Sequence, residues 1–183
     1  MPPDQPTPPE RLETGRLILR RPVPTDAEAM FARWAQDPEV TRYLVWRPHT
    51  SLDDSRAHIA RCVQSWENGR EFVWLLEEKG SGRLAGSIAT RPDQHGVNVG
   101  YLVARDCWGR GFMPEALRAV TEWWLSQPGV FRVWATCDIE NPASARVLEK
   151  SGFTLEGTLR RWQAHVNLDA EPRDALCYSR VGS

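Results

Sequence analysis

The chain has 183 residues, of which 41% are hydrophobic and 26% are charged, the balance of an ordinary globular domain with a substantial core. The formal net charge of −1 argues against a general attraction to nucleic acid or to anionic membranes. The four cysteines are scattered without metal-ligand spacing, and no apolar run is long enough to span a membrane. We therefore expect one cytoplasmic domain over residues 11–183, preceded by a Pro-rich disordered or extended tail over residues 1–10.

The first third of the chain predicts one strand and two helices. Residues 16–20 predict a strand, which two prolines close. The first helix opens on a capping-box pattern at residues 25–28, and the second runs from Ser51 to Asn68 and Gly69. A loop over residues 40–50 separates the helices.

The remaining elements alternate between strands and helices. Three strands with short turns predict an antiparallel meander, and the last one leads into a helix that begins near Pro114. Asn141 is the expected N-cap of a later short helix that ends at Gly152. The strands are predicted at residues 72–77, 84–90, 97–103, 130–137, 153–159 and 175–179. This order is typical of an α+β (mixed α/β layer) fold.

The loop at residues 108–114, sequence WGRGFMP, is the strongest local motif. A helix start leaves main-chain N–H groups without partners, and glycines allow a phosphate to approach them, so the loop is a candidate anion cradle. The same glycines also fit a simple tight turn. A Walker A loop is excluded, since no Gly-Lys-Ser/Thr follows. A dinucleotide fingerprint lacks its third glycine, where Pro114 stands, although Asp138 lies where a ribose-binding acid is expected.

Two motifs together suggest a family. The loop 108–116 (WGRGFMPEA) and the later segment 141–153 (NPAS…KSGF) resemble the GNAT superfamily of N-acetyltransferases, over residues 12–178. The likeness is greatest to the Rim-type branch of ribosomal-protein N-terminal (alanine/serine) acetyltransferases, to which the entry segment 13–20 is also similar. The resemblance implies a GNAT-like fold, with a central, mostly antiparallel sheet that is splayed between the fourth and fifth strands and flanked by helices.

The resemblance also implies where acetyl-CoA binds as co-substrate. Its pyrophosphate falls on the loop amides, its pantetheine arm lies along the strand at residues 97–103, and no metal takes part. Three positions depart from the family: Asp106 replaces a phosphate-contacting Gln or Arg, Asn98 replaces a catalytic Glu, and Leu148 replaces a Tyr. Beside Asp106, Arg105 is a candidate to compensate. The implied cofactor-binding residues are Leu102, Val103, Gly109, Arg110, Gly111, Phe112, Met113, Asn141 and Ser144.

The implied reaction is direct attack of a primary amine on the acetyl thioester. Ser144 and Asn141 are the expected catalytic residues, with Ser144 stabilising the leaving sulfur or relaying a proton. The acceptor is expected beside Trp46, Arg47 and His49. No general base stands out. The positional candidates are His49, His95, Asp138 and Glu140.

The expected acceptor is a protein N-terminal α-amine, since its pKa near ~8 is well below the ~10.4 of lysine. Alternatives are a small-molecule amine (amino sugar, polyamine or amino acid), for which Asp53, Asp54 and Glu71 could line the mouth, a non-catalytic acyl-CoA-binding module, and a dinucleotide-binding protein. The expected partners are acetyl-CoA and the amine, with no nucleic acid and no membrane. The protein is expected to be a monomer or homodimer.

Overall fold

One twisted sheet organises the molecule. The computed structural model describes residues 6–94, 96–169 and 171–182. Within these residues eight strands form a single sheet in the order β1-β2-β3-β4-β5-β6-β8-β7, and every neighbouring pair is antiparallel except β5 and β6. The predicted mixed, mostly antiparallel fold is confirmed. The strands are β1 (Arg11–Glu13), β2 (Leu17–Arg20), β3 (Phe72–Glu78), β4 (Leu84–Pro92), β5 (Gly96–Val103), β6 (Arg132–Asp138), β7 (Thr154–Gln163) and β8 (Arg173–Val181).

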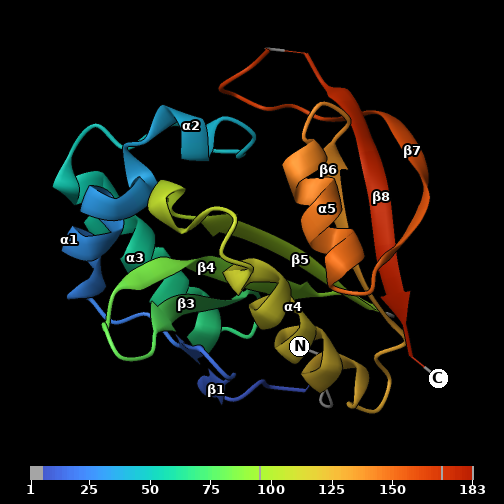
Figure 1. The fold of residues 1–183 in the computed structure, drawn as a ribbon, viewed down its shortest axis with the longest axis horizontal. Coiled ribbons are helices and arrows are strands. Elements are labelled where there is room, and N and C mark those ends of the chain that lie inside the picture. Colours follow the sequence, from blue (N-terminus) through green and yellow to red (C-terminus); the bar gives the residue numbers. More distant parts are fainter. Residues whose placement is uncertain (1–5, 95, 170, 183) are drawn as a thin grey trace.

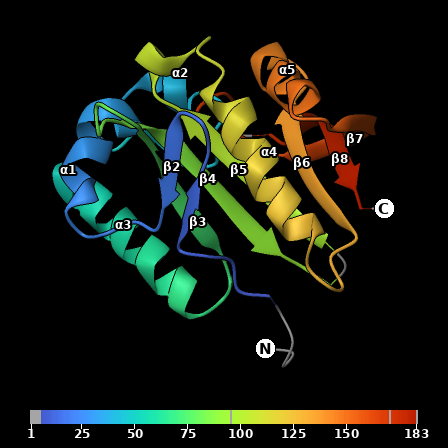
Figure 2. The same cartoon turned by 60° about the horizontal axis from the view of Figure 1, so that its bottom comes forward.

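The helices divide into two groups around this sheet. Figure 1 shows α1, α2 and α3 beside the half that holds β3 and β4, while α5 lies beside β6, β7 and β8. Figure 2 shows α4 crossing the sheet next to α5. The helices are α1 (Asp26–Met30), continued by a π-helical turn over Phe31–Ala35, α2 (Pro38–Thr41), α3 (Leu52–Glu67), α4 (Phe112–Leu125) and α5 (Pro142–Lys150).

Tryptophans fill the core between helices and sheet. Trp34, Trp74 and Trp124 are almost completely buried, from three different elements. The indole N–H of Trp74 donates to the Pro9 carbonyl at 3.0 Å, and the Arg21 N–H donates to the Glu10 carbonyl at 2.8 Å. The end of the predicted tail is therefore hydrogen-bonded to the domain, whereas residues 1–5 lie outside the described residues. In the part that the structure describes, no helix is long and apolar enough to cross a membrane.

The helix starts test the capping predictions. The helix predicted to start at Ser51 is α3, and it opens on a capping box that was not predicted, since Ser51 and Asp54 each accept from the other's main-chain N–H. The box predicted at Thr25 is wrong, because Thr25 makes no side-chain cap. There the carboxylate of Asp26 accepts from Arg20 at 2.7 Å and from the Val23 N–H at 2.7 Å. Strand β2 thus brings Arg20 to the Asp26 carboxylate, a contact that the spacing of the local sequence did not predict.

The start of α4 differs from the prediction by two residues. Gly111 is the N-cap, with a φ of 75°, and the helix begins at Phe112. Pro114 is therefore the third helical residue, not the first. Its missing N–H costs nothing there, since the first turn of a helix has no intrahelical acceptor for it. The shift leaves the N–H groups of Phe112 and Met113 at the exposed helix start.

The sheet opens between β5 and β6. Their parallel pairing covers only Gly96–Asn98 with Arg132–Trp134, and beyond it the strands separate. The splay predicted between the fourth and fifth strands is confirmed; these are β5 and β6 because the structure adds a short β1 that the sequence did not predict. On its other side β5 stays paired to β4 as far as Val103.

The free edge of β5 has a defined hydrogen-bonding pattern. The Ala104 N–H donates to the Ala85 carbonyl at 2.9 Å, so alternate residues before it bond to β4. The main-chain groups of Val99, Tyr101 and Val103 consequently face the gap, whereas those of Leu102 face β4. A Cβ at Gly86 on β4 would come within 2.3 Å of the Leu102 carbonyl oxygen, as this orientation requires.

Candidate active site

The gap leads into a cavity of about 940 Å³. Its wall is formed by β5, the end of β6, the loop before α4, the start of α5, residues 39–46 around α2 and the loop between β7 and β8. Nine of the residues expected to bind ligands line it: Trp46, Leu102, Val103, Gly109, Gly111, Phe112, Met113, Asn141 and Ser144. Three do not, namely Arg47, His49 and Arg110.

The loop at residues 109–113 presents main-chain N–H groups. Gly109 and Gly111 both have positive φ, 74° and 75°, and no described atom lies within 4 Å of a Cβ built on Gly109. The N–H groups of Gly109, Gly111, Phe112 and Met113 have no hydrogen-bond acceptor among the described residues. An open loop with four such donors at a helix N-terminus fits a pyrophosphate. The Arg110 N–H differs, since it donates to the Cys107 carbonyl at 3.4 Å.

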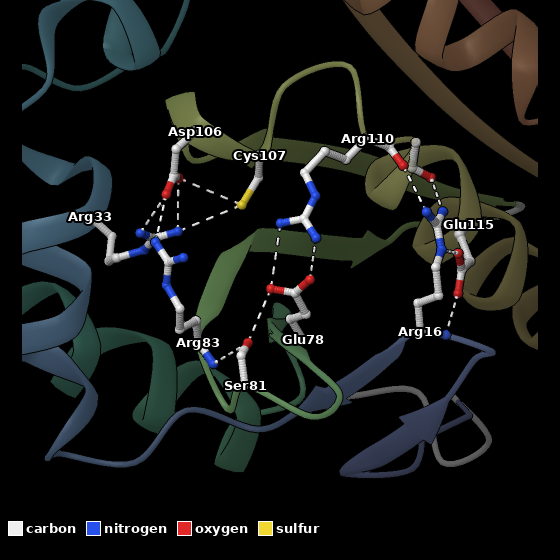
Figure 3. A network of polar contacts seen from close by, with 10 residues as sticks. Arg16, Arg33, Glu78, Ser81, Arg83, Asp106, Cys107, Arg110 and Glu115 are labelled. Atoms are coloured by element: carbon white, nitrogen blue, oxygen red, sulfur yellow. Dashed lines mark hydrogen bonds and ion pairs between the residues drawn. The ribbon is translucent and has the colours of Figure 1, made fainter.

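Arg16 holds the carbonyl groups of this loop (Figure 3). Its guanidinium donates to the carbonyl oxygens of Arg110 at 2.8 Å and Gly111 at 3.2 Å, and to Glu115 at 2.7 Å. Burial would raise the pKa of Glu115, but hydrogen bonds from Thr14 and Arg16 outweigh it and leave that pKa lowered. This partner of Glu115 comes from the segment just before β2, and the sequence analysis did not identify it.

The charged side chains around the loop bind protein partners. The Arg110 guanidinium lies 4.4 Å from the centre of the Phe112 ring and is paired with Glu78 (Figure 3). Asp106 accepts from Arg33 at 2.8 Å and Arg83 at 2.6 Å. Asp106 thus ties the loop to the π-helical turn after α1 and to the turn before β4.

Arg105, the candidate to compensate for Asp106, points elsewhere. Its Nε donates to Asp37 at 2.8 Å, and this pair joins the turn before the loop to the N-cap of α2. The hydrogen bond from Arg105 keeps the pKa of Asp37 lowered, although burial opposes it. Arg105 is therefore engaged in a structural ion pair and is absent from the cavity wall.

Ser144 meets a tyrosine from the opposite side of the gap. The Tyr101 hydroxyl lies 2.8 Å from Ser144 Oγ, and the side chain of Asn141 accepts from the Ser144 N–H at 3.1 Å. Leu148, which stands where relatives carry a Tyr, is fully buried. A tyrosine hydroxyl therefore does reach Ser144, but it belongs to Tyr101 on β5 and not to a residue of α5. Sequence reasoning missed it because Tyr101 is 43 residues from Ser144.

Aromatic and imidazole rings form the end of the cavity near α2. The Trp46 ring lies 4.9 Å from that of His49 and 5.7 Å from that of His58. His49 is directed away, with Nδ1 2.7 Å from Ser55 Oγ, whereas His58 lines the cavity and was not predicted. Burial lowers the pKa of His58 to about 4, so it is uncharged at neutral pH.

Two loops meet over this end of the cavity. We call this part of the cavity the acceptor end, and we define it by residues 39–46, His58 and the loop between β7 and β8. The side-chain amide of Asn167 donates to the carbonyls of Thr41 at 2.7 Å and Trp46 at 2.8 Å. The Tyr43 hydroxyl donates to the Glu140 carbonyl at 2.8 Å. These bonds fix the loop at residues 40–50 against the second half of the sheet.

The least exposed carboxylates of the cavity wall are paired with arginines. Asp138, with a side chain that is 0% exposed, accepts from Arg173 Nε at 2.7 Å, and Glu71 pairs with Arg91. Burial opposes ionisation of Asp138, but Arg173 prevails and the pKa of Asp138 is lowered. Asp53 and Asp54, expected at the mouth, are instead an exposed partner of Arg56 and the cap of α3, and neither lines the cavity.

A sheet that opens around a cavity, with a phosphate-sized cradle of amides at one end, defines an acyl-CoA-dependent transferase. The family model for the acetyltransferase (GNAT) domain matches residues 16–154, and the chain belongs to this family. It is an N-acetyltransferase that uses acetyl-CoA as co-substrate, as the family and the similarity to a named N-acetyltransferase show. This identity replaces the dinucleotide-binding and non-catalytic alternatives.

Individual relatives are similar over nearly the whole chain. The uncharacterized N-acetyltransferase YoaA of Bacillus subtilis is 33% identical over 173 residues, which cover 93% of this chain and 96% of that protein. The ribosomal-protein-serine acetyltransferase of Escherichia coli is 26% identical over 134 residues, 72% of each chain. The structure of RimL, a ribosomal L7/L12 alpha-N-protein acetyltransferase, in complex with coenzyme A has a TM-score of 0.83 at 21% identity, covering 94% of this chain and 98% of that one. These matches agree with the Rim-type resemblance.

Proposed function

We propose that this protein acetylates a protein N-terminal α-amine. The observation that carries the proposal is the pairing of the cavity's least exposed carboxylates, since Asp138 and Glu71 are each neutralised by an arginine. A polyamine or an aminoglycoside brings several ammonium groups and requires carboxylates that are free to receive them. A peptide N-terminus brings one. The similarity to an enzyme named for acetylating a ribosomal protein supports the same choice.

In the proposed complex the loop at residues 109–113 binds the CoA pyrophosphate and the pantetheine arm follows the free edge of β5. Within this edge the Trp108 indole already donates to the Val103 carbonyl at 2.8 Å. The N–H groups of Tyr101 and Val103 are the donors that remain for the arm and for the acetyl carbonyl. Losing one donor to a developing oxyanion typically costs ~3 kcal/mol.

The proposed chemical step is direct attack of the neutral amine on the acetyl carbon, followed by loss of the CoA thiolate. Holding the two reactants in line supplies much of the rate, on the order of 7–11 kcal/mol at best. The hydroxyl of Ser144, hydrogen-bonded to Tyr101 and positioned by Asn141, stabilises the sulfur and passes it a proton. Trp46 and its neighbours hold the acceptor, and the protein acts in the cytoplasm as a monomer or homodimer.

An acceptor panel tests the proposal. Thiol release from acetyl-CoA is measured with peptides that begin with Ser or Ala, with the same peptides blocked at the N-terminus but carrying lysine, and with free lysine, spermidine and an aminoglycoside. We expect turnover of the unblocked peptides only, with mass spectrometry locating the acetyl group on the α-nitrogen. A higher kcat/KM for spermidine or the aminoglycoside, or an acetyl group on the lysine side chain, contradicts the proposal.

A further inference from the structure

A second imidazole lies in the wall of the acceptor end. His165 belongs to the loop between β7 and β8, is only 6% exposed and lines the cavity. Its ring packs edge-on against that of Tyr43, with centroids 6.2 Å apart. The ring is therefore held between the two loops that form this end. The sequence analysis assigned no role to His165.

The two ring nitrogens of His165 have different surroundings. Nε2 lies 3.6 Å from Oδ2 of the fully buried Asp138. Nδ1 is buried and has no hydrogen-bond partner among the described residues. Buried polar atoms in native structures are nearly always satisfied, so the orphaned Nδ1 of a cavity residue indicates a group that an ordered water or a ligand completes. A proton on Nε2, facing the carboxylate, leaves a lone pair on Nδ1.

The charged groups around this ring keep it neutral. Burial lowers the pKa of His165, and the charge of Arg173 on β8 acts in the same direction. Asp138 at the end of β6 and the main chain of Tyr43 oppose this without reversing it. Arg173 also neutralises Glu140 in the following turn, at 2.6 Å. A neutral imidazole is the form that accepts a proton near pH 7.

We propose that His165 is the general base of this N-acetyltransferase and that Asp138 is the positioning residue that orients it. This assignment rests on the direct attack described under the proposed function. One N–H bond of the acceptor ammonium breaks and its proton passes to His165 Nδ1 through one bridging water, since Nδ1 is itself buried behind the cavity surface. The nitrogen lone pair then forms the bond to the acetyl carbon, and the C–S bond breaks. The second proton lost by the nitrogen reaches the CoA sulfur through Ser144, and His165 returns its own proton to water.

The tautomer of His165 tests the geometry without any acceptor. Nitrogen NMR of the ¹⁵N-labelled wild-type protein bound to acetyl-CoA is expected to show, at pH 7, a neutral His165 with its proton on Nε2. In the opposite arrangement, Nδ1 would carry the proton and Nε2 the lone pair. Finding that tautomer, or a charged ring at pH 7, overturns the proposal.

Kinetics of His165→Gln test the chemistry. With an amine that the wild-type protein acetylates, kcat is expected to fall about 100-fold, while the Kd for acetyl-CoA stays within about twofold. The wild-type pH profile of kcat is expected to decline below a pKa lower than 6.5, and the variant to lack this decline. Val166→Ala changes the next, more exposed side chain of the same loop and is the matched control, expected to keep wild-type turnover.

Three results overturn the assignment: a variant kcat within about threefold of wild type, an acidic decline that persists in the variant, or a wild-type profile without one. If His165→Gln does not fold, the wild-type pH profile and tautomer decide. The test uses whichever amine is turned over in the panel, so a small-molecule acceptor would refute the proposed function while leaving the His165 result intact. If no amine is turned over, the proposed function fails and the tautomer alone decides on His165.

Discussion

The cradle before α4 makes a sharp prediction for Gly111→Ala. Gly111 has a φ of 75°, which costs an L-residue roughly 1–2 kcal/mol, while an added Cβ would meet only Arg16 Nη2 at 3.5 Å, an ordinary contact. The variant can relieve this strain by rotating the two peptide groups that carry the N–H groups of Gly111 and Phe112. Losing one hydrogen bond to a charged phosphate costs about 1.5–3 kcal/mol, which corresponds to about a 10- to 100-fold weaker Kd for acetyl-CoA.

Gly129→Ala is the matched control for this experiment. Gly129 has a φ of 81°, open space around its Cβ position and no place in the cavity wall. Both variants are expected to lose about 1–2 kcal/mol of stability in urea unfolding, because both force an alanine into the left-handed region. Only Gly111→Ala is expected to weaken acetyl-CoA binding in isothermal titration. Wild-type affinity in Gly111→Ala, or an equal loss in Gly129→Ala, refutes the assignment of the loop as the phosphate site.

Two further predictions concern the polar pairs of the cavity. Ser144→Ala and Tyr101→Phe are each expected to lower kcat more than acetyl-CoA affinity, and the double variant to be little worse than either, since the two hydroxyls act as one unit; additive losses in steady-state kinetics would argue against the relay. Asp138→Asn is expected to cost about 1.5–3 kcal/mol of stability at pH 7, because it removes the charge-assisted hydrogen bond from Arg173, which keeps Glu140 as its other partner. Because the folded pKa of Asp138 lies below its usual 3.8, this difference is present above pH 3.8 and is lost as the pH falls through the folded pKa. Urea unfolding of the wild-type protein and of Asp138→Asn across this pH range measures the difference in stability. A stability difference that does not change with pH would show that the Asp138–Arg173 ion pair is not its cause.

Local patterns were sufficient for much of the fold. The start of α3 at Ser51, the N-cap of α5 at Asn141 and the strands on either side of the gap were all predicted. Each of these depends on residues close together in the chain, through hydrophobic periodicity or a cap three residues away. The family motif rests on the same kind of information.

Contacts between distant segments escaped prediction. Arg16 lies 94 residues from the Arg110 carbonyl that it binds, and Tyr101 lies 43 residues from Ser144. Spacing along the chain carries no information about such pairs.

The sequence by itself therefore determined the order of elements apart from β1 and α2, the glycine-containing loop before α4 and the family, because helices, strands and glycine-containing turns are set by short-range chemistry. Only the tertiary structure decided which carboxylates are neutralised, which hydroxyl faces Ser144 and that His165 stands beside Asp138 in the acceptor end. These features arise where β5 and β6 separate and two loops close over the gap. Their burial and charge exist only once the sheet has brought the segments together.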